Sequence, residues 1–186
     1  MVIEDRPEIE RSFRFTIARV ACGMSAILAP ESTNRLQEAA DSNPDESAYL
    51  GKHIMLYDGI CSYCKGVVEA ALDSDESAQF FFSPLQSPFA QKTLGRYGID
   101  SLELRSMYVV SDYGTSDEAL RAAAPASNFL LLRLSGELKQ LGEANTRKPR
   151  ALQDAEYKAV ADCRYDTHPK LAEVTIPVAN RQRFIF

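Results

Sequence analysis

Residues 54–72 constrain the fold of this chain more than any other stretch. Residues 54–57 form an uninterrupted apolar run, which favours a short buried strand. An Asp-Gly pair follows as a turn signal, and residues 66–72 then carry apolar side chains at helical spacing. Cys61 and Cys64 therefore lie where a predicted strand ends and a predicted helix begins.

The spacing of the two cysteines has chemical consequences. Side chains three positions apart in the first turn of a helix lie on the same face, so we expect Cys61 and Cys64 to meet. A helix N-terminus carries partial positive charge and unpaired N–H groups, which stabilise the thiolate that acts in thiol–disulfide exchange. The first cysteine of such a pair is usually the more exposed one. We therefore assign Cys61 as the attacking thiol and Cys64 as the resolving thiol.

Four segments of the chain resemble one known family in the correct order. Residues 56–64 resemble the Asp-Gly-x-Cys-x-x-Cys signature of the DCC family (DUF393), whose members are described as thiol-disulfide oxidoreductases with a thioredoxin-like fold. Residues 82–87 are similar to its Pro-Leu-Gln-Ser segment, and residues 116–120 fit a Ser-Asp-x-Ala-Leu element. Residues 152–166 are similar to its C-terminal helix, with its Arg-Asp-Ala-x-Tyr and Val-Ala-x-x-Arg-Tyr motifs. The resemblance covers residues 54–168 and is specific for the family.

The resemblance implies an α/β fold with a thioredoxin-like core, to which this chain adds an N-terminal helix and C-terminal helices. It implies a reversible disulfide between Cys61 and Cys64, with substrate proteins that carry disulfides or thiols; this exchange needs no cofactor and no metal. It also places Asp58 among the catalytic candidates. Asp58 would accept the proton of the resolving thiol if burial raised its pKa, or it would form an Asx turn at the corner.

The rest of the pattern predicts alternating strands and helices, as a thioredoxin-like unit requires. The predicted strands cover residues 54–57, 79–83 and 105–111. The predicted helices cover residues 66–72, 87–97, 117–124, 126–141 and 151–165.

Two features of the C-terminal region bear on the site. Tyr157, Arg164 and Tyr165 fall on the predicted helix at residues 151–165, and helix packing explains them better than a role in the site. Residues 184–186 end the chain as an exposed aromatic cluster, although hydrophobic residues in a tail are more often docked than free.

Composition excludes several classes of function. The 186 residues are 45% hydrophobic and 25% charged, which is ordinary for a soluble globular protein. The net charge of −5 gives no support to nucleic-acid binding, and no apolar run is long enough to span a membrane. The 4 cysteines are too sparse for a disulfide-stapled secreted scaffold.

We divide the chain into three parts: an N-terminal extension over 1–50, made of a helix and a polar linker; a thioredoxin-like domain over 51–168; and an extended C-terminal tail over 169–186. Residues 11–30 are amphipathic and free of acidic side chains, which is similar to an organelle transit segment. Residues 1–10 are acidic and argue against that reading, so we prefer a docked helix. Localisation in a mitochondrion or plastid and in the cytoplasm both fit the sequence.

Two other functions fit parts of the sequence. The N-terminal helix, the leucine-rich segment and the aromatic tail could bind partners, so the chain could be a non-catalytic accessory or structural subunit of a larger assembly. Cys163 and His168 could join Cys61 and Cys64 as zinc ligands, although the wide separation makes this pattern unspecific. In addition, no proline directly precedes residues 107–110, where thioredoxin-like proteins commonly place a cis proline that contacts peptide substrates.

Overall fold

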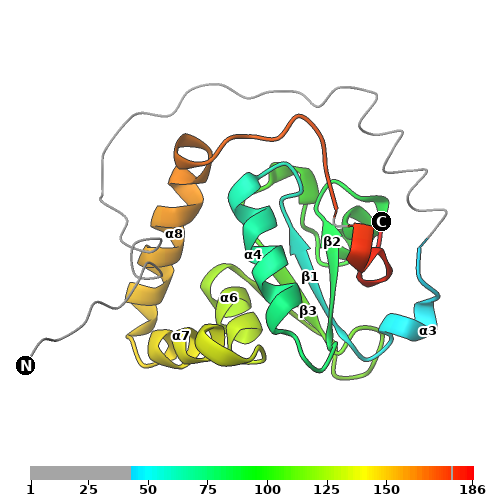
Figure 1. The fold of residues 1–186 in the computed structure, drawn as a ribbon, viewed down its shortest axis with the longest axis horizontal. Coiled ribbons are helices and arrows are strands. Elements are labelled where there is room, and N and C mark those ends of the chain that lie inside the picture. Colours follow the sequence, from blue (N-terminus) through cyan, green and yellow to red (C-terminus); the bar gives the residue numbers. More distant parts are fainter. Residues whose placement is uncertain (1–42, 177) are drawn as a thin grey trace, which may run out of the picture.

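The computed structural model describes residues 43–176 and 178–186. These residues form a four-stranded mixed sheet with helices packed around it (Figure 1). The strands are β1 (His53–Tyr57), β2 (Phe80–Pro84), β3 (Tyr108–Ser111) and β4 (Ala119–Ala122). The α-helices are α3 (Glu46–Tyr49), α4 (Ser62–Ser74), α5 (Pro88–Gly95), α6 (Ala123–Leu131), α7 (Gly136–Thr146) and α8 (Arg150–Thr167). Two 3-10 helices complete the set, η1 (Ser101–Glu103) and η2 (Val178–Arg183).

The strand order is β2-β1-β3-β4. Strands β1 and β2 run parallel, whereas β3 is antiparallel to both β1 and β4. A parallel pair needs a crossover connection, and α4 supplies it between β1 and β2. This β–α–β unit followed by a β–β–α unit is the thioredoxin-like arrangement that the sequence predicted.

Alternating side chains of the central strand divide the hydrophobic core into two clusters. Met55 and Tyr57 belong to a cluster with residues of α4 and α6, whereas Ile54 and Leu56 belong to a cluster with residues of α5. Successive side chains of a strand point to opposite faces of a sheet, so an unbroken apolar run is what a strand buried on both faces requires. The prediction of a buried strand at residues 54–57 is confirmed.

The last three residues of the chain pack as a continuation of the sheet. Phe184 pairs with Phe82 in a parallel bridge, and the Ile185 N–H donates to the Phe82 carbonyl at 2.9 Å. Phe184 and Phe186 join the cluster on the α4 face, and Ile185 joins the cluster on the α5 face. The exposed fraction is 0% for Phe184 and Ile185 and 3% for Phe186, so the prediction of an exposed aromatic cluster was wrong. The backbone of this segment pairs with the open edge of β2, and its apolar side chains are buried in the core of the same chain.

An ion pair holds the same segment in place. The Arg183 guanidinium donates to the Asp75 carboxylate and to the Phe80 carbonyl oxygen. Asp75 is buried, and its other oxygen accepts from the Gln79 N–H at 3.1 Å. Because a buried carboxylate is costly without partners, Arg183 is part of the fold rather than a free surface cation.

The helix predicted at residues 117–124 is not formed. Residues 119–122 are strand β4, which pairs with β3, and the helix starts only at Ala123. The local sequence Glu-Ala-Leu-Arg-Ala favours a helix, but β3 would otherwise expose the backbone groups of its outer edge. Pairing with β3 outweighs the local preference here.

The leucine-rich segment is also divided differently from the prediction. A single helix was expected over 126–141, whereas α6 ends at Leu131 and α7 begins at Gly136. Gly136 has a φ of +61°, a conformation that glycine adopts without strain. The two helices then pack closely, since a Cβ at Gly142 would stand 2.8 Å from the Leu131 Cβ. Leu130 and Leu134 thus join the core of their own chain, and Leu138 packs against it. The helix predicted over 151–165 is confirmed as α8.

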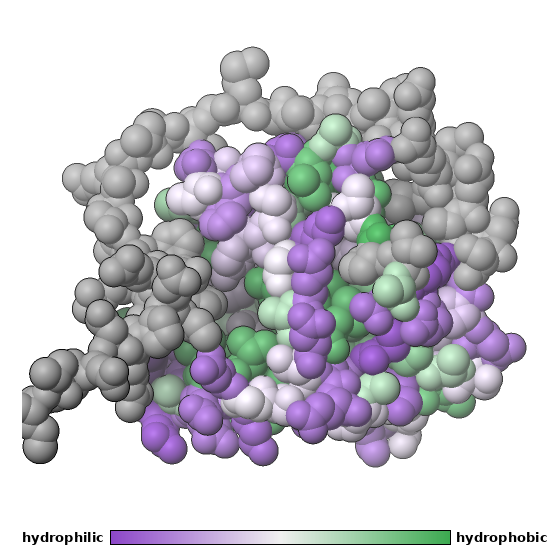
Figure 2. Space-filling view, viewed as in Figure 1, coloured by the Kyte–Doolittle hydropathy of each residue, from purple (hydrophilic) through white to green (hydrophobic). Residues whose placement is uncertain are grey.

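The surface of α4 that points away from the sheet is polar. Lys65 and Glu69 form an ion pair at 3.8 Å along it, and Figure 2 shows hydrophilic residues over this region of the molecule. Among the described residues, no helix has the length and apolar character needed to cross a membrane. The N-terminal helix predicted within residues 11–30 lies outside the described residues.

Candidate active site

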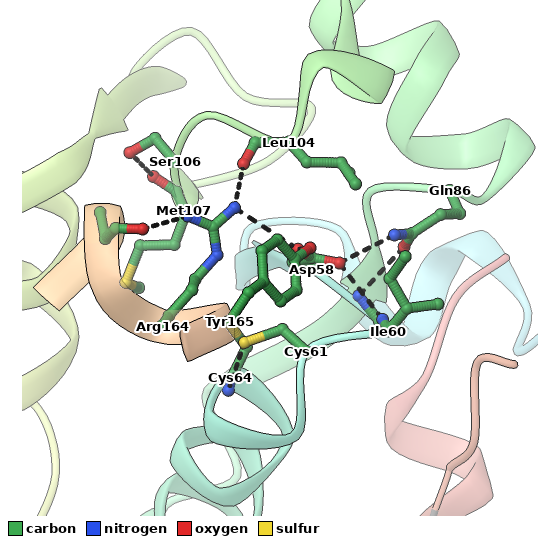
Figure 3. A network of polar contacts seen from close by, with 12 residues as sticks. Asp58, Ile60, Cys61, Cys64, Gln86, Leu104, Ser106, Met107, Arg164 and Tyr165 are labelled. Carbon is green, nitrogen blue, oxygen red and sulfur yellow. Dashed lines mark hydrogen bonds and ion pairs between the residues drawn. The ribbon is translucent and has the colours of Figure 1, made fainter. Parts of the chain in front are cut away.

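The corner between β1 and α4 brings the two cysteines together. Cys61 is the N-cap of α4, and its Sγ accepts a hydrogen bond from the Cys64 N–H at 3.1 Å (Figure 3). The Cys61 N–H in turn donates to the Asp58 carbonyl at 3.2 Å, which closes the turn. The first turn of α4 contains no acidic residue that would cancel the partial positive charge of the helix end. The prediction that the cysteines lie at a strand-to-helix junction is confirmed.

The two thiols differ in their electrostatic environment. The pKa of Cys61 lies below its ordinary value, chiefly because the Cys64 thiol donates a hydrogen bond to its sulfur and the Cys64 N–H adds a second. Burial and the Asp58 carboxylate oppose this lowering, whereas the Arg164 guanidinium assists it. The pKa of Cys64 is raised, first because its thiol is the donor in that hydrogen bond and then because it is buried. The pair therefore favours a thiolate on Cys61 and a neutral thiol on Cys64.

The accessibility of the two cysteines is the reverse of the prediction. Cys61, expected to be the more exposed cysteine, has an exposed fraction of 0%, whereas Cys64 is only half-buried. Residues 168–174, which we call the strap, run across the start of α4. Lys170 pairs with Cys61 in an antiparallel bridge, and the Leu171 N–H donates to the Ile60 carbonyl at 2.8 Å. The strap therefore lies along the backbone of the cysteine that the electrostatics favour as nucleophile.

Asp58 lies at the centre of a buried polar network (Figure 3). Its Oδ1 accepts from the Ile60 N–H at 3.2 Å and from Gln86 Nε2 at 2.9 Å. Its Oδ2 accepts from the Tyr165 hydroxyl and lies 3.6 Å from the Arg164 guanidinium. The contact with Ile60 is the Asx turn expected for an Asp at this corner.

Gln86 and Gly59 complete the same corner. The Gln86 Oε1 accepts from the Gly59 N–H at 3.0 Å, so this side chain bridges the turn and the Asp58 carboxylate. A Cβ at Gly59 would stand 2.8 Å from the Pro84 Cβ and 2.9 Å from a methyl group of Val174. The turn therefore excludes any residue larger than glycine at this position without movement of its neighbours.

Sequence reasoning missed Gln86, Arg164 and Tyr165 as members of the site. Helix packing was the preferred explanation for Arg164 and Tyr165, but α8 directs both side chains toward Asp58. Arg164 also donates to the Leu104 carbonyl at 2.6 Å, and its guanidinium lies 4.6 Å from the centre of the Tyr165 ring. The available signal was that all three residues belong to the segments that resemble the DCC family. Nothing local to those segments shows that they meet.

Tyr157 contacts the loop before β3. Its hydroxyl accepts from the Met107 N–H at 3.0 Å and lies 3.0 Å from the Ser106 hydroxyl. This loop is where thioredoxin-like proteins commonly carry a cis proline, and none of the described peptide bonds is cis. The Tyr157 hydroxyl is thus the hydrogen-bond acceptor for the Met107 N–H at the edge of the site.

The four proposed zinc ligands do not form a metal site. Cys163 is exposed on α8, and the His168 ring packs at 5.1 Å from the Tyr63 ring. Within residues 43–176 and 178–186, no group of three or more His, Cys, Asp or Glu side chains is placed to hold a metal ion. The zinc hypothesis is therefore not supported by the arrangement of its ligands.

The fold and the corner together define a class of protein. A thioredoxin-like sheet with a Cys-x-x-Cys pair at the start of the first crossover helix is the arrangement of a thiol-based redox protein. Comparison with known families agrees, because the model of the DCC1-like thiol-disulfide oxidoreductase family matches residues 55–169. The chain belongs to this family, as the sequence motifs indicated.

One curated protein is similar to most of this chain. The uncharacterized protein YuxK of Bacillus subtilis (strain 168) is 27% identical over 143 residues, which is 75% of this chain and 98% of that protein. No solved structure matches the chain.

Proposed function

We propose that this protein is a thiol–disulfide oxidoreductase in which Cys61 is the attacking thiol and Cys64 the resolving thiol. The observation that carries the proposal is the geometry of the pair: Cys61 is the N-cap of α4, and its Sγ accepts from the Cys64 N–H at 3.1 Å. In this arrangement the pKa of Cys61 is lowered and that of Cys64 is raised. The sequence argument chose Cys61 as the attacking thiol because it was expected to be the more exposed cysteine, and in the structure it is the more buried one. Electrostatics now supports the same assignment, because the thiolate is the attacking species.

The exchange proceeds in two displacements. The Cys61 thiolate attacks one sulfur of a substrate disulfide, the substrate S–S bond breaks, and the departing sulfur leaves as a thiolate that takes up a proton. Cys64 then loses its proton and attacks the Cys61 sulfur, which forms the Cys61–Cys64 disulfide and releases the second substrate sulfur as a thiolate. The protein dithiol is oxidised by two electrons and the substrate disulfide is reduced by two.

We assign Asp58 a positioning role in this reaction. Both of its oxygens already accept hydrogen bonds, which fits a group that fixes the corner better than one that collects a proton from Cys64. Its charge opposes a thiolate on Cys61, and Arg164 offsets that effect from α8. The buried carboxylate and guanidinium thus form a neutral pair beside the thiols.

The test is the midpoint reduction potential of the cysteine pair. The protein would be equilibrated across glutathione and dithiothreitol redox series, and its thiols trapped with an alkylating agent and counted by mass. Cys22→Ser and Cys163→Ser remove the two cysteines outside the pair from the count, and Cys61→Ser is the control that cannot form the disulfide. A reversible two-electron couple in the range of about −120 to −270 mV is expected. Failure to form the disulfide at any poise would refute the proposal.

No specific observation favours the alternative that the chain is a non-catalytic subunit of a larger assembly. Two of the features behind it, the leucine-rich segment and the aromatic tail, pack within the chain itself. The third, the N-terminal extension, lies largely outside the described residues.

A further inference from the structure

The strap crosses the reactive end of the molecule between two fixed points. It leaves α8 at its C-terminal end and passes over the start of α4 before the chain reaches η2 beside β2 (Figure 1). Its far end packs on the core, because Val174 lies against the cluster on the α4 face. The strap is therefore held against Cys61 by both of its neighbours in sequence.

The contact between the strap and the site is made by backbone groups. Lys170 stands opposite Cys61 in an antiparallel bridge, and the Leu171 N–H donates to the Ile60 carbonyl at 2.8 Å. This is the pairing by which an extended peptide adds to an open backbone edge, with the main chain supplying affinity and the side chains supplying specificity. The edge formed by Ile60 and Cys61 is thus complementary to an extended polypeptide.

Aromatic side chains border this edge. The Lys170 Nζ lies 5.1 Å from the centre of the Tyr165 ring, and the His168 ring lies 5.1 Å from that of Tyr63. Lys170 itself is exposed, so its side chain rests on Tyr165 without filling a pocket of the core. A different side chain at the same place would not disturb the packing of the fold.

We propose that the strap occupies the binding edge for an extended polypeptide substrate, whose half-cystine takes the place of Lys170 opposite Cys61. This inference rests on the proposed function and names its substrate class and binding register. Opposed residues in an antiparallel pair have Cα atoms about 4.5–5.5 Å apart, within the range of about 4.4–6.8 Å that a disulfide bridges. A substrate half-cystine in this register therefore presents its sulfur to Cys61.

Cys61 is buried in the same structure in which the strap pairs with its backbone. The Cys61 thiolate must approach the substrate sulfur before the substrate S–S bond can break, and Cys61 has an exposed fraction of 0% in the structure in which the strap pairs with its backbone. The incoming peptide replaces the strap's backbone hydrogen bond at Ile60 with its own. The leaving substrate sulfur departs with its electron pair, as in the exchange described above.

The register is tested by an intramolecular trap. Lys170→Cys would be made with Cys22, Cys64 and Cys163 replaced by serine, so that Cys61 is the sole native thiol. Mild oxidation with oxidised glutathione is expected to join Cys61 to the cysteine introduced at position 170, detected by mass spectrometry of the digest. Ala172→Cys in the same background is the matched control, because it lies exposed on the same strap but outside the bridge. Equal or greater cross-linking at position 172 would overturn the register.

Replacement of the strap by substrate is tested with peptide disulfides. Leu171→Pro removes the N–H that bonds to Ile60, whereas Leu171→Ala keeps it. A single hydrogen bond of this kind corresponds to about a fivefold effect, so the proline variant should reduce an extended peptide disulfide about fivefold faster than the alanine variant. With the proline variant, N-methylation of the residue after the half-cystine should slow reduction about fivefold, and N-methylation one residue later should not.

Reduction of 2-hydroxyethyl disulfide separates the two proposals. If the protein reduces this small disulfide and the two N-methylated peptides react alike, the peptide edge is refuted and the oxidoreductase function stands. If neither the small disulfide nor any peptide is reduced, the proposed function itself fails. Slower reduction of the first N-methylated peptide, with no change for the second, supports both the oxidoreductase function and the peptide-binding edge.

Discussion

Replacement of Phe184 by alanine is expected to destabilise the fold strongly. Phe184 has an exposed fraction of 0%, and its ring centre lies 5.7 Å from that of Phe82 on the edge strand of the sheet. Removal of a buried phenylalanine side chain costs about 3–5 kcal/mol, from lost burial and from the cavity that remains. A domain typically has only about 5–15 kcal/mol of stability, so this single change removes a large share of it.

The measurement is unfolding in urea followed by circular dichroism, together with thermal denaturation. For a chain of this size each kcal/mol lowers Tm by about 2–4 °C, so Phe184→Ala should lower it by about 10 °C. Leu152→Ala is the control, because Leu152 is 46% exposed on α8 and its loss should change stability by less than about 0.5 kcal/mol. If Phe184→Ala unfolds at the same urea concentration as the wild type, the tail is not part of the core. The tail would then be available to a partner.

Three further predictions concern the site. Cys64→Ala should raise the pKa of Cys61 relative to Cys64→Ser, because serine keeps a hydroxyl that can donate to the Cys61 sulfur. The pH profile of Cys61 alkylation should therefore lie at higher pH in the alanine variant. Identical profiles in the two variants would refute the hydrogen-bond argument. Gly59→Ala should lower the free energy of unfolding by about 1–3 kcal/mol in urea, because the added Cβ meets Pro84. Gly66→Ala is the control: Gly66 lies within α4, its added Cβ would meet no neighbouring group within 4 Å, and alanine should raise the free energy of unfolding by about 0.5–1 kcal/mol. Tyr165→Phe should cost about 1–3 kcal/mol by removing a donor to the buried carboxylate, and unchanged calorimetric stability would contradict this.

The elements that sequence reasoning predicted well are those with a strong local signal. The strand at residues 54–57 is apolar throughout, and the helix at residues 151–165 has helical spacing without proline or glycine. The elements that it missed depend on partners distant in sequence. Residues 119–122 have a helical composition but form a strand because β3 offers an unpaired edge. The break between α6 and α7 allows the leucine-rich segment to fold back on itself.

The candidate site shows the same division. Cys61 and Cys64 could be placed from sequence because their spacing and the strand-to-helix corner are local. The relative burial of the two cysteines could not, because it depends on segments distant in sequence, such as the strap that pairs with the backbone of Cys61. Exposure was the wrong reason for choosing Cys61, and the hydrogen bonds of Cys64 are a better one.

By itself, the sequence determined the family, the α/β class and the position of the cysteine pair at a helix start. These follow from motifs and periodicities within short windows, where neighbouring residues set the backbone conformation. Tertiary structure alone decided that Gln86, Arg164 and Tyr165 surround Asp58. It also decided that residues 168–186 pair with the backbone of Cys61 and with the open edge of β2. The physical reason is that a buried carboxylate and an open strand edge both need partners, and only the folded chain brings those partners within reach.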